Sequence, residues 1–408
     1  MREGWKEKTI GEMCDVVNGG TPKTGVSGYW DGPYQWITPA EMGKRVTPYI
    51  QQTERTITGE GLQNSSARLL PPHSVILSSR APIGYLVINT APMATNQGCK
   101  GLVPTKEIDH KFLFYYLTSI VELLNELGSG ATFKELSGGK LKEIPVPIAP
   151  LPEQHRIVAI LDEAFEGIAT VKANAEKSLQ NARKVFESHL NAIFSQRCKG
   201  WVEKRLGDIC SISSKLVDPR KDDMLDLVHI GAGNIESKTG ALIDPRTAGE
   251  EGLISGKFNF DSSMVLYSKI RPYLVKVVRP KFNGLCSADI YPLLPEKKLI
   301  TRDYLYYLLL SKDFTDYAVH GSARAGMPKV NREHLFSYKT YIPTILQQKA
   351  YAEQLDGMHE ETQHLETLYQ QKLTALDELK KSLLYQAFNG ELHTRNGNRC
   401  PEQSQHHQ

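Results

Sequence analysis

The chain has 408 residues, of which 40% are hydrophobic and 23% charged, a composition typical of a folded protein with two or more domains. It contains no apolar run of about 18 residues, and the polar start (MREGWKEKT) lacks the apolar core of a secretory signal, so we expect no membrane span and a cytoplasmic location. The formal net charge of +3 is small for a protein that binds nucleic acid unaided, so any such binding requires local positive charge or help from partners.

Residues 1–150 are predicted to form one globular module that mixes strands and helices. The short runs VILSS (75–79) and GYLVI (84–88) indicate strands, and turn signals such as NGGTPKTG and SGG separate the elements. Phe112–Leu127 (FLFYYLTSIVELLNEL) has apolar residues at helical spacing and predicts one amphipathic helix.

Residues 151–199 are predicted to form one long helix. Apolar residues from Ile157 to Phe194 recur three or four positions apart, and Pro150 and Pro152 mark the start. At 1.5 Å per residue, a helix of roughly 40 residues is about 60 Å long. A single apolar stripe of this length needs a packing partner.

From residue 200 the chain repeats itself. GWKEKTIGEMC (4–14) returns as GWVEKRLGDIC (200–210) with six identities in eleven positions, and FLFYYLTS (112–119) returns as YLYYLLLS (304–311). MVLYS (264–268) indicates a strand, and Asp303–Val319 predicts one amphipathic helix, as in the first copy. We therefore predict a second module over 200–343.

A second long helix is predicted over 344–392, where TILQQKAYAEQLD (344–356) answers PLPEQHRIVAILD (150–162) and Asn389-Gly390 supplies a stop. The polar residues 393–408 have no period and are predicted to be a disordered tail. We expect the two helices to pair as an antiparallel coiled coil; the alternative is two separate helices, each packed on its own module. The predicted fold class is α+β, two repeated mixed α/β modules joined by two long antiparallel coiled-coil helices.

Several motifs, in their order and duplication, resemble the specificity (S) subunit of Type I restriction–modification enzymes. They include Gly19-Gly20-Thr21-Pro22, Trp36-Ile37-Thr38-Pro39, Thr95-Asn96-Gln97-Gly98, Pro150-Leu151-Pro152-Glu153-Gln154 and Lys372–Leu392. The second copy departs from the pattern, with Ile345-Leu346-Gln347-Gln348-Lys349 in place of Pro-Leu-Pro-Glu-Gln, which leaves the start of its helix open.

The resemblance implies that the modules are target recognition domains that read a bipartite, asymmetric site on double-stranded DNA. It implies no active site or cofactor on this chain. It further implies that the helices dock two methyltransferase (modification) subunits, that two restriction (translocase and nuclease) subunits can join, and that S-adenosylmethionine, ATP and Mg²⁺ bind to those partners.

The residues independently indicate little chemistry on this chain. There is no GxxxxGK[ST] for ATP, and Asp31-Gly32-Pro33-Tyr34 lacks the first proline of an adenine-methyltransferase tetrapeptide. The six cysteines form no CxxC pair, so no zinc site is predicted. Asp289 and Glu296 of the second module lack counterparts in the first, so no Mg²⁺ cluster for nuclease chemistry is predicted.

Polar and basic residues of the loops are the candidate DNA contacts, because Asn and Gln pair with adenine edges and Arg and Lys with guanine edges or phosphates. In the first module they are Thr21, Lys23, Tyr29, Ser79, Arg80, Asn96, Gln97 and Lys134. In the second they are Lys215, Arg220, Lys221, Asn234, Lys269, Arg271, Ser287, Arg324 and Lys329. The alternative for each is a solvated loop side chain or a turn-forming hydrogen bond, and Tyr29, Trp30, Tyr34 and Trp36 could stack on bases or pack in the core.

Two other functions remain possible at this point. A coiled-coil scaffold that binds only proteins would explain the apolar stripe and the low net charge, but not two elaborate modules with polar loops. A stand-alone DNA methyltransferase or nuclease would require the motifs that are missing here.

Overall fold

A computed structural model describes residues 4–130, 134–212, 215–322 and 327–392. By contacts the chain divides into two compact units, Met1–Asn174 with Lys372–Gln408, and Ala175–Gln371. The helices α7 (Leu151–Phe194) and α12 (Ile345–Phe388) each contribute one half to each unit. The predicted tail, 393–408, lies outside the described residues, and the predicted domain boundaries stay a prediction.

The first module is built on a five-stranded sheet with the order β2-β9-β6-β7-β4, a three-stranded sheet β5-β3-β8 and the pair β1-β10. Its strands are β1 (Lys6–Thr9), β2 (Cys14–Asn18), β3 (Trp30–Ile37), β4 (Tyr49–Ile50), β5 (Thr56–Ile57), β6 (Val75–Ser79), β7 (Ile83–Asn89), β8 (Met93–Thr95), β9 (Cys99–Pro104) and β10 (Pro145–Ile148). Its helices are α1 (Ile10–Met13), α2 (Pro39–Met42), α3 (Gly59–Gln63), α4 (His110–Ser119), α5 (Val121–Leu127) and α6 (Gly138–Lys142), with a 3₁₀ turn η1 (Ser27–Tyr29).

The second module has sheets of the order β12-β20-β17-β18 and β13-β16-β19-β14-β15 and the pair β11-β21. Its strands are β11 (Val202–Arg205), β12 (Cys210–Ser211), β13 (Leu216–Val217), β14 (Val228–Ile230), β15 (Arg246–Thr247), β16 (Lys257–Phe260), β17 (Val265–Ser268), β18 (Val277–Val278), β19 (Gly284–Cys286), β20 (Ile290–Pro295) and β21 (Lys339–Ile342). Its helices are α8 (Leu206–Ile209), α9 (Arg302–Leu310), α10 (Lys312–His320) and α11 (Arg332–Ser337), with a 3₁₀ turn η2 (Pro272–Leu274).

The two modules share one topology, which confirms the repeat found in the sequence. The strands β2-β9-β6-β7 match β12-β20-β17-β18, and in both modules all of these neighbours run antiparallel. The parallel pair β3-β8 matches the parallel pair β14-β19. The predicted strands at 75–79, 84–88 and 264–268 are present as β6, β7 and β17.

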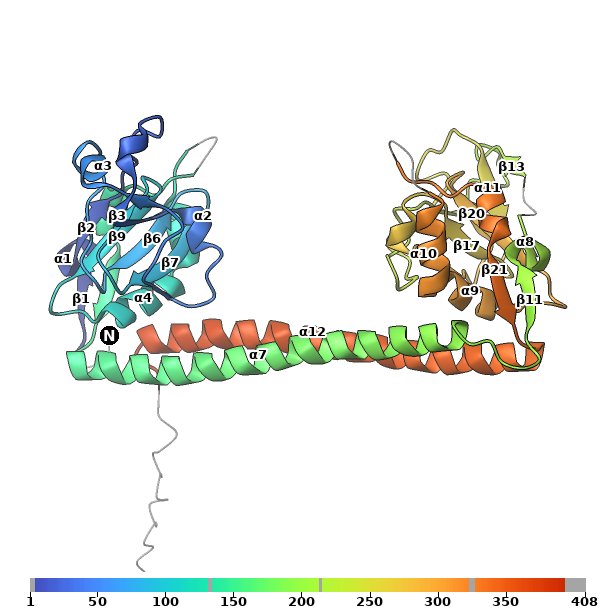
Figure 1. The fold of residues 1–408 in the computed structure, drawn as a ribbon. Coiled ribbons are helices and arrows are strands. Elements are labelled where there is room, and N and C mark those ends of the chain that lie inside the picture. Colours follow the sequence, from blue (N-terminus) through green and yellow to red (C-terminus); the bar gives the residue numbers. More distant parts are fainter. Residues whose placement is uncertain (1–3, 131–133, 213–214, 323–326, 393–408) are drawn as a thin grey trace, which may run out of the picture. The chain divides into compact units, whose positions relative to one another are not determined.

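Each unit packs its module against two antiparallel helix halves (Figure 1). In the first unit, Lys172 of α7 pairs with Asp377 of α12 at 3.1 Å, and Arg156 near the start of α7 donates to the carbonyl of Leu392 beyond the end of α12. In the second unit, Arg183 of α7 pairs with Glu366 of α12 at 2.6 Å, and Phe186 of α7 packs against His359 of α12. The numbering rises on one helix as it falls on the other, so the predicted antiparallel pairing is confirmed within each unit.

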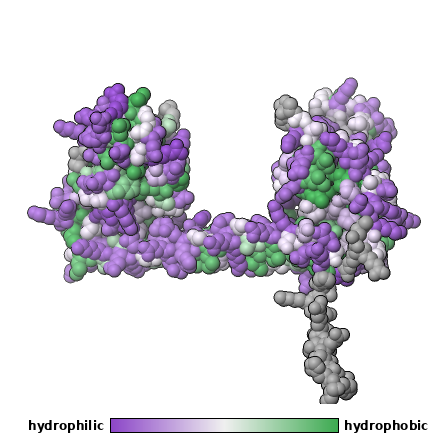
Figure 2. All heavy atoms as spheres, turned by 180° about the vertical axis from the view of Figure 1, so that it is seen from behind, coloured by the Kyte–Doolittle hydropathy of each residue, from purple (hydrophilic) through white to green (hydrophobic). Residues whose placement is uncertain are grey.

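Aromatic residues fix these helix halves to the modules. Phe388 of α12 packs edge-on against Phe112 and Tyr116 of α4, and Phe194 of α7 packs on Tyr304 of α9. These side chains belong to one hydrophobic cluster in each unit. No helix among the described residues is long and apolar enough to cross a membrane. On the face shown in Figure 2, the paired helices present a mainly hydrophilic surface.

The prediction of a single helix over Phe112–Leu127, and of another over Asp303–Val319, is wrong. The first is divided into α4 and α5 at Ile120, whose φ of −109° and ψ of 18° lie outside the helical region. The second is divided into α9 and α10 at Ser311, whose backbone is extended and whose side chain accepts a hydrogen bond from the Phe314 amide. Hydrophobic period alone misses such breaks because the apolar stripe continues across them.

Candidate nucleic-acid interface

Three chain segments of the first module meet at the end of strand β6. The amide of Ser79, the last residue of β6, donates to the carbonyl of Gly98 in the loop before β9, at 2.7 Å. The carbonyl of Ser79 accepts from the amide of Leu136 at 2.8 Å. Loop residues that are distant in sequence are therefore held together by backbone hydrogen bonds at one edge of the sheet.

Asn96 organises the loop between β8 and β9. Its Oδ1 accepts from the Gly98 amide at 2.7 Å, its Nδ2 donates to Thr21 Oγ1 at 2.9 Å, and its own amide donates to the Ile37 carbonyl at 2.9 Å. A Cβ on Gly19 would lie 1.9 Å from the Asn96 carbonyl oxygen, so only glycine allows this close approach. Gln97 is left exposed beside the loop, where its Oε1 accepts from Thr21.

Three charged side chains gather at this place, and we call them the first charge cluster: Arg80, Lys100 and Glu135. Glu135 lies 3.8 Å from Arg80 and 3.8 Å from Lys100. The Arg80 and Glu135 side chains are 36% and 42% exposed, whereas the Lys100 side chain is only 8% exposed. The cluster therefore offers solvent one cation and one carboxylate, with a nearly buried lysine beside them.

The second module builds the same loop junction. The amide of Lys269 donates to the Asp289 carbonyl at 3.0 Å, and the Lys269 carbonyl accepts from the Val330 amide at 2.8 Å. Ser287 donates its amide to the Ile230 carbonyl at 3.0 Å, and its Oγ accepts from the Asp289 amide at 3.2 Å. In this pattern of hydrogen bonds, Lys269 is the structural equivalent of Ser79, and Ser287 is the structural equivalent of Asn96.

The second charge cluster consists of Lys269, Asp289 and Lys329. Asp289 lies 3.6 Å from Lys269 and 3.8 Å from Lys329. The Asp289 and Lys329 side chains are 47% and 43% exposed, and that of Lys269 is 12% exposed. Burial, together with the nearby Lys329 ammonium, lowers the pKa of Lys269 below its ordinary value. Each module thus has two cations around one carboxylate at the same place in its fold.

The backbone bonds show that these charges do not occupy equivalent positions. Gly98 stands where the second module has Asp289, and Ser79 stands where it has Lys269. The bridge Arg80↔Glu135 is matched by Ile270↔Lys329. The combination of charges is therefore common to both modules although the residues that supply it are different.

The other candidate residues lie in various settings. Lys23, Lys134, Lys215 and Lys221 are exposed, Tyr29 is half-buried against the cluster around Trp30 and Trp36, and Arg324 lies outside the described residues. Ser79 is buried. Arg220 is exposed and paired with Asp218 at 2.7 Å, and Arg271 is exposed in a turn where its φ is +49°.

Asn234 is a turn-forming residue. Its Oδ1 accepts from the Gly231 amide at 2.9 Å, and its Nδ2 donates to the carbonyls of Ile243 and Asp244 at 3.1 and 3.2 Å. Both ends of the side chain form hydrogen bonds within the loop. For Asn234 the structure therefore favours the turn-forming role over a DNA contact.

Sequence reasoning missed Lys100 and Glu135, and it did not include Asp289 among the candidate DNA contacts. A lysine inside the otherwise apolar run CKGLVP (99–104) was a usable signal, because lysine is almost never buried without a partner. The sequence around Glu135 gives no such signal, because Glu135 comes close to Arg80 only through a backbone bridge between the two residues.

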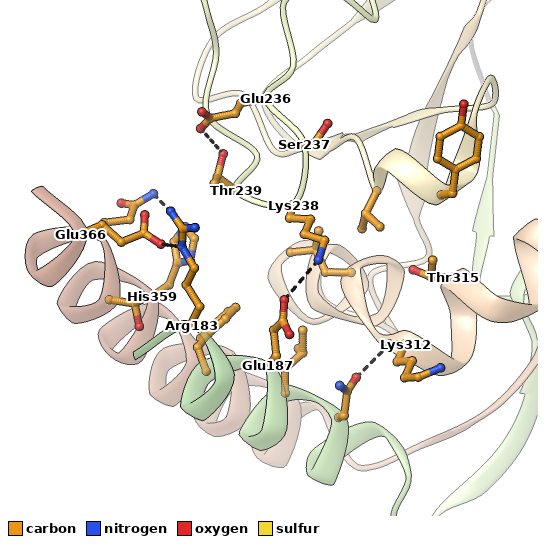
Figure 3. A pocket seen from close by; sticks show the side chains of 18 of the residues that line it. Arg183, Glu187, Glu236, Ser237, Lys238, Thr239, Lys312, Thr315, His359 and Glu366 are labelled. Atoms are coloured by element: carbon orange, nitrogen blue, oxygen red, sulfur yellow. Dashed lines mark hydrogen bonds and ion pairs between the residues drawn. The ribbon is translucent and has the colours of Figure 1, made fainter. Parts of the chain in front are cut away.

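A second candidate site is a cavity of about 610 Å³ in the second unit, lined by residues of α7, α12, α10 and the loop 236–239 (Figure 3). Four of its charged groups form two ion pairs, Lys238 with Glu187 at 3.4 Å and Arg183 with Glu366 at 2.6 Å. Asn191 Oδ1 accepts from the Lys312 amide at 2.8 Å. The contacts of Glu187 and Asn191 join α7 to the module, and the Arg183–Glu366 pair joins the two helices, so we assign this cavity to the support of the module.

Comparison with protein families places both modules in one family model. The model for the Type I restriction modification DNA specificity domain matches residues 2–180 and 198–375. The chain is 31% identical over 235 residues to the MjaIX specificity subunit of a Type I restriction enzyme from Methanocaldococcus jannaschii, and this match covers 53% of the chain and 54% of that relative. It is 27% identical over 318 residues to the EcoDI specificity subunit of Escherichia coli, covering 70% of each. The match thus spans about half the length of the first relative.

Solved structures show the same fold. A chain from a study of complex assembly and conformational transition of the type I R-M system has a TM-score of 0.76 at 16% identity, covering 96% of this chain and 99% of that one. The HsdS subunit from Thermoanaerobacter tengcongensis has a TM-score of 0.57 at 16% identity, covering 96% and 98%.

Proposed function

The chain belongs to the Type I restriction modification DNA specificity domain family, and from this premise we propose that it reads a bipartite, asymmetric DNA site, one half-site with each module. The observation that carries the proposal is the charge cluster that each module builds at the end of its central strand. Two copies of one fold with different residues at that place are suited to two different half-sites.

The residues proposed to contact DNA are the exposed and half-exposed side chains around the clusters. They are Arg80, Gln97 and Lys134 in the first module and Ser287 and Lys329 in the second, with Lys23, Lys215, Arg220 and Lys221 as flanking phosphate contacts. Arg and Lys donate to guanine edges or phosphates, and Gln pairs with adenine.

We propose that the chain is a non-catalytic subunit that works inside a larger complex. Two modification subunits would dock on the helices and methylate adenine, and two restriction subunits would add an ATP-dependent nuclease. S-adenosylmethionine, ATP and Mg²⁺ would then bind to those partners. The net charge of +3 supports this division, because partners would contribute much of the attraction for phosphate.

The test is a map of methylated adenines in cells that carry this chain with its modification subunit. The expected motif has two specified halves separated by unread bases. Replacement of residues 1–150 by the corresponding module of another specificity subunit should change one half and leave the other intact. A change in both halves, or in neither, would contradict separate reading by the two modules.

A further inference from the structure

The two charge clusters share a geometry that points to one kind of base pair. In each, the carboxylate lies within 3.8 Å of both a half-exposed cation and a nearly buried lysine. Glu135 has Arg80 and Lys100, and Asp289 has Lys329 and Lys269. The shared arrangement is notable because the position of the Glu135 carboxylate corresponds to that of a cation, Lys329, in the second module.

The ion pairs in the first cluster leave donors free for another partner. A separation of 3.8 Å between a carboxylate oxygen and a side-chain nitrogen is longer than a hydrogen bond. Among the described residues, Glu135 is the only ion-pair partner of both Arg80 and Lys100. The guanidinium of Arg80 is 36% exposed and its ion-pair partner lies beyond hydrogen-bond distance, so its donors suit a ligand that supplies acceptors.

The carboxylate decides what kind of ligand fits. A phosphate has only acceptor oxygens and a negative charge, so an exposed carboxylate beside the cations would repel it. The major-groove edge of a guanine–cytosine pair shows the N7 and O6 acceptors of guanine and the N4 amino donor of cytosine. A cation next to a carboxylate matches that edge.

We propose that each charge cluster reads one guanine–cytosine pair in its half-site. Arg80 in the first module and Lys329 in the second donate to guanine, and Glu135 and Asp289 accept from the cytosine amino group. Lys100 and Lys269 are positioning residues whose positive charges lie beside the carboxylates, and the Lys269 ammonium is itself held by the Ala288 carbonyl, to which it donates. This inference rests on the proposed function, and it goes beyond it by naming the base pair and the residues.

The test compares Glu135→Gln and Asp289→Asn in the full complex with the modification subunit. Binding is measured on oligonucleotides that carry the mapped site and on a series with each base pair replaced in turn. Glu135→Gln should reduce the preference for guanine–cytosine about tenfold at one position of one half-site, since a good base contact gives about this discrimination. Asp289→Asn should do the same in the other half-site only.

A matched control is Glu107→Gln, which removes an exposed carboxylate of the first module that pairs with Lys8 at 2.6 Å, beyond the opposite end of β9. It should leave the preference unchanged at every position. Arg80→Gln supplies a second measurement, and its loss of preference should fall on the same base pair as that of Glu135→Gln.

Three outcomes would overturn the inference. One is a mapped site in which either half-site contains no guanine–cytosine pair. Another is a uniform rise in affinity for all sequences in Glu135→Gln, which is the result for a phosphate contact. The third is that Arg80→Gln and Glu135→Gln affect different positions. If the wild-type complex shows no bipartite specificity at all, the proposed function itself fails, and this result is distinct from the three.

Discussion

Gln348 makes in the second unit the same three hydrogen bonds that Gln154 makes in the first. Gln154 Oε1 accepts from the Asp109 amide at 2.9 Å, and its Nε2 donates to the carbonyls of Glu107 and Ala149 at 2.9 and 2.8 Å. Gln348 Oε1 accepts from the Thr301 amide at 2.9 Å, and its Nε2 donates to the carbonyls of Leu299 and Pro343 at 2.8 and 2.9 Å. Both side chains are fully buried. This amide fastens the first turn of each long helix to its module.

Gln348→Ala is expected to destabilise the second unit by about 3 kcal/mol, because three backbone groups that are buried or half-buried lose their partners at roughly 1 kcal/mol or more each. The measurement is amide hydrogen exchange at Thr301, combined with thermal unfolding. Gln354→Ala is the control, because Gln354 lies on the same helix and is exposed. Equal protection of Thr301 in the two variants would show that Gln348 does not anchor the helix.

The stability of the second unit is expected to fall in acid through Asp303. Burial by itself raises the pKa of this carboxyl, but hydrogen bonds from Arg279 at 2.8 Å and Arg302 at 2.9 Å outweigh it and hold the pKa below its ordinary value. A carboxyl with a lowered folded-state pKa contributes stability above its unfolded pKa and loses it as the pH falls through the folded value. The loss should therefore occur below about pH 4.

The measurement compares wild type with Asp303→Asn by denaturant unfolding between about pH 7 and pH 3. The variant should be less stable near neutral pH, and the difference should shrink in acid, where the aspartate is protonated as well. Asp226→Asn, which changes an exposed carboxyl, is the control. A difference that stays constant over this range would rule out the ion pairs as its cause.

The chain alone is expected to show no methyl transfer, DNA cleavage or ATP hydrolysis. The physical reason is the absence from the sequence of a P-loop and of an adenine-methyltransferase tetrapeptide with both prolines. The assay uses the purified full chain with labelled S-adenosylmethionine, with plasmid DNA and Mg²⁺, and with ATP. Methyl transfer that copurifies with the chain through several columns would contradict the proposed division of labour.

Most of the fold could be predicted because the sequence contains a repeat. Some residues recur in both copies because each module forms the same packing contacts. Examples are GWKEK with GWVEK, and Gln154 with Gln348. The helices were predictable because an apolar stripe of period 3.6 extends over more than ten turns. The breaks at Ile120 and Ser311 were not, since they depend on backbone angles that the apolar pattern does not encode.

The charge clusters were only partly predictable. Arg80, Lys269 and Lys329 are basic loop residues and were named from the sequence. Lys100 and Glu135 were not, because strand β9 and the bridge at Glu135 bring them to Arg80 from positions 20 and 55 residues further along the chain. The sequence repeat could not reveal the clusters either, since equivalent positions in the two modules do not carry the same charges.

Asn96 and Gln97 are neighbours that are expected to act differently. Asn96 holds the loop through the Gly98 amide and Thr21, so Asn96→Ala should loosen the whole junction at the end of β6. Gln97 is exposed and receives hydrogen bonds from Thr21 and Asn96 without supporting the backbone. Gln97→Ala should leave the fold intact and weaken recognition at one position of the half-site by about 1–3 kcal/mol, the range for one base contact.

The two variants are separated by measuring binding and stability together. Asn96→Ala should lower the melting temperature and weaken binding at several positions, because Gln97, Gly98 and Arg80 all depend on this junction. Gln97→Ala should keep the wild-type melting temperature and relax a single base pair. If it instead lowers affinity evenly across all sequences, Gln97 serves the positioning of the DNA backbone and does not read a base.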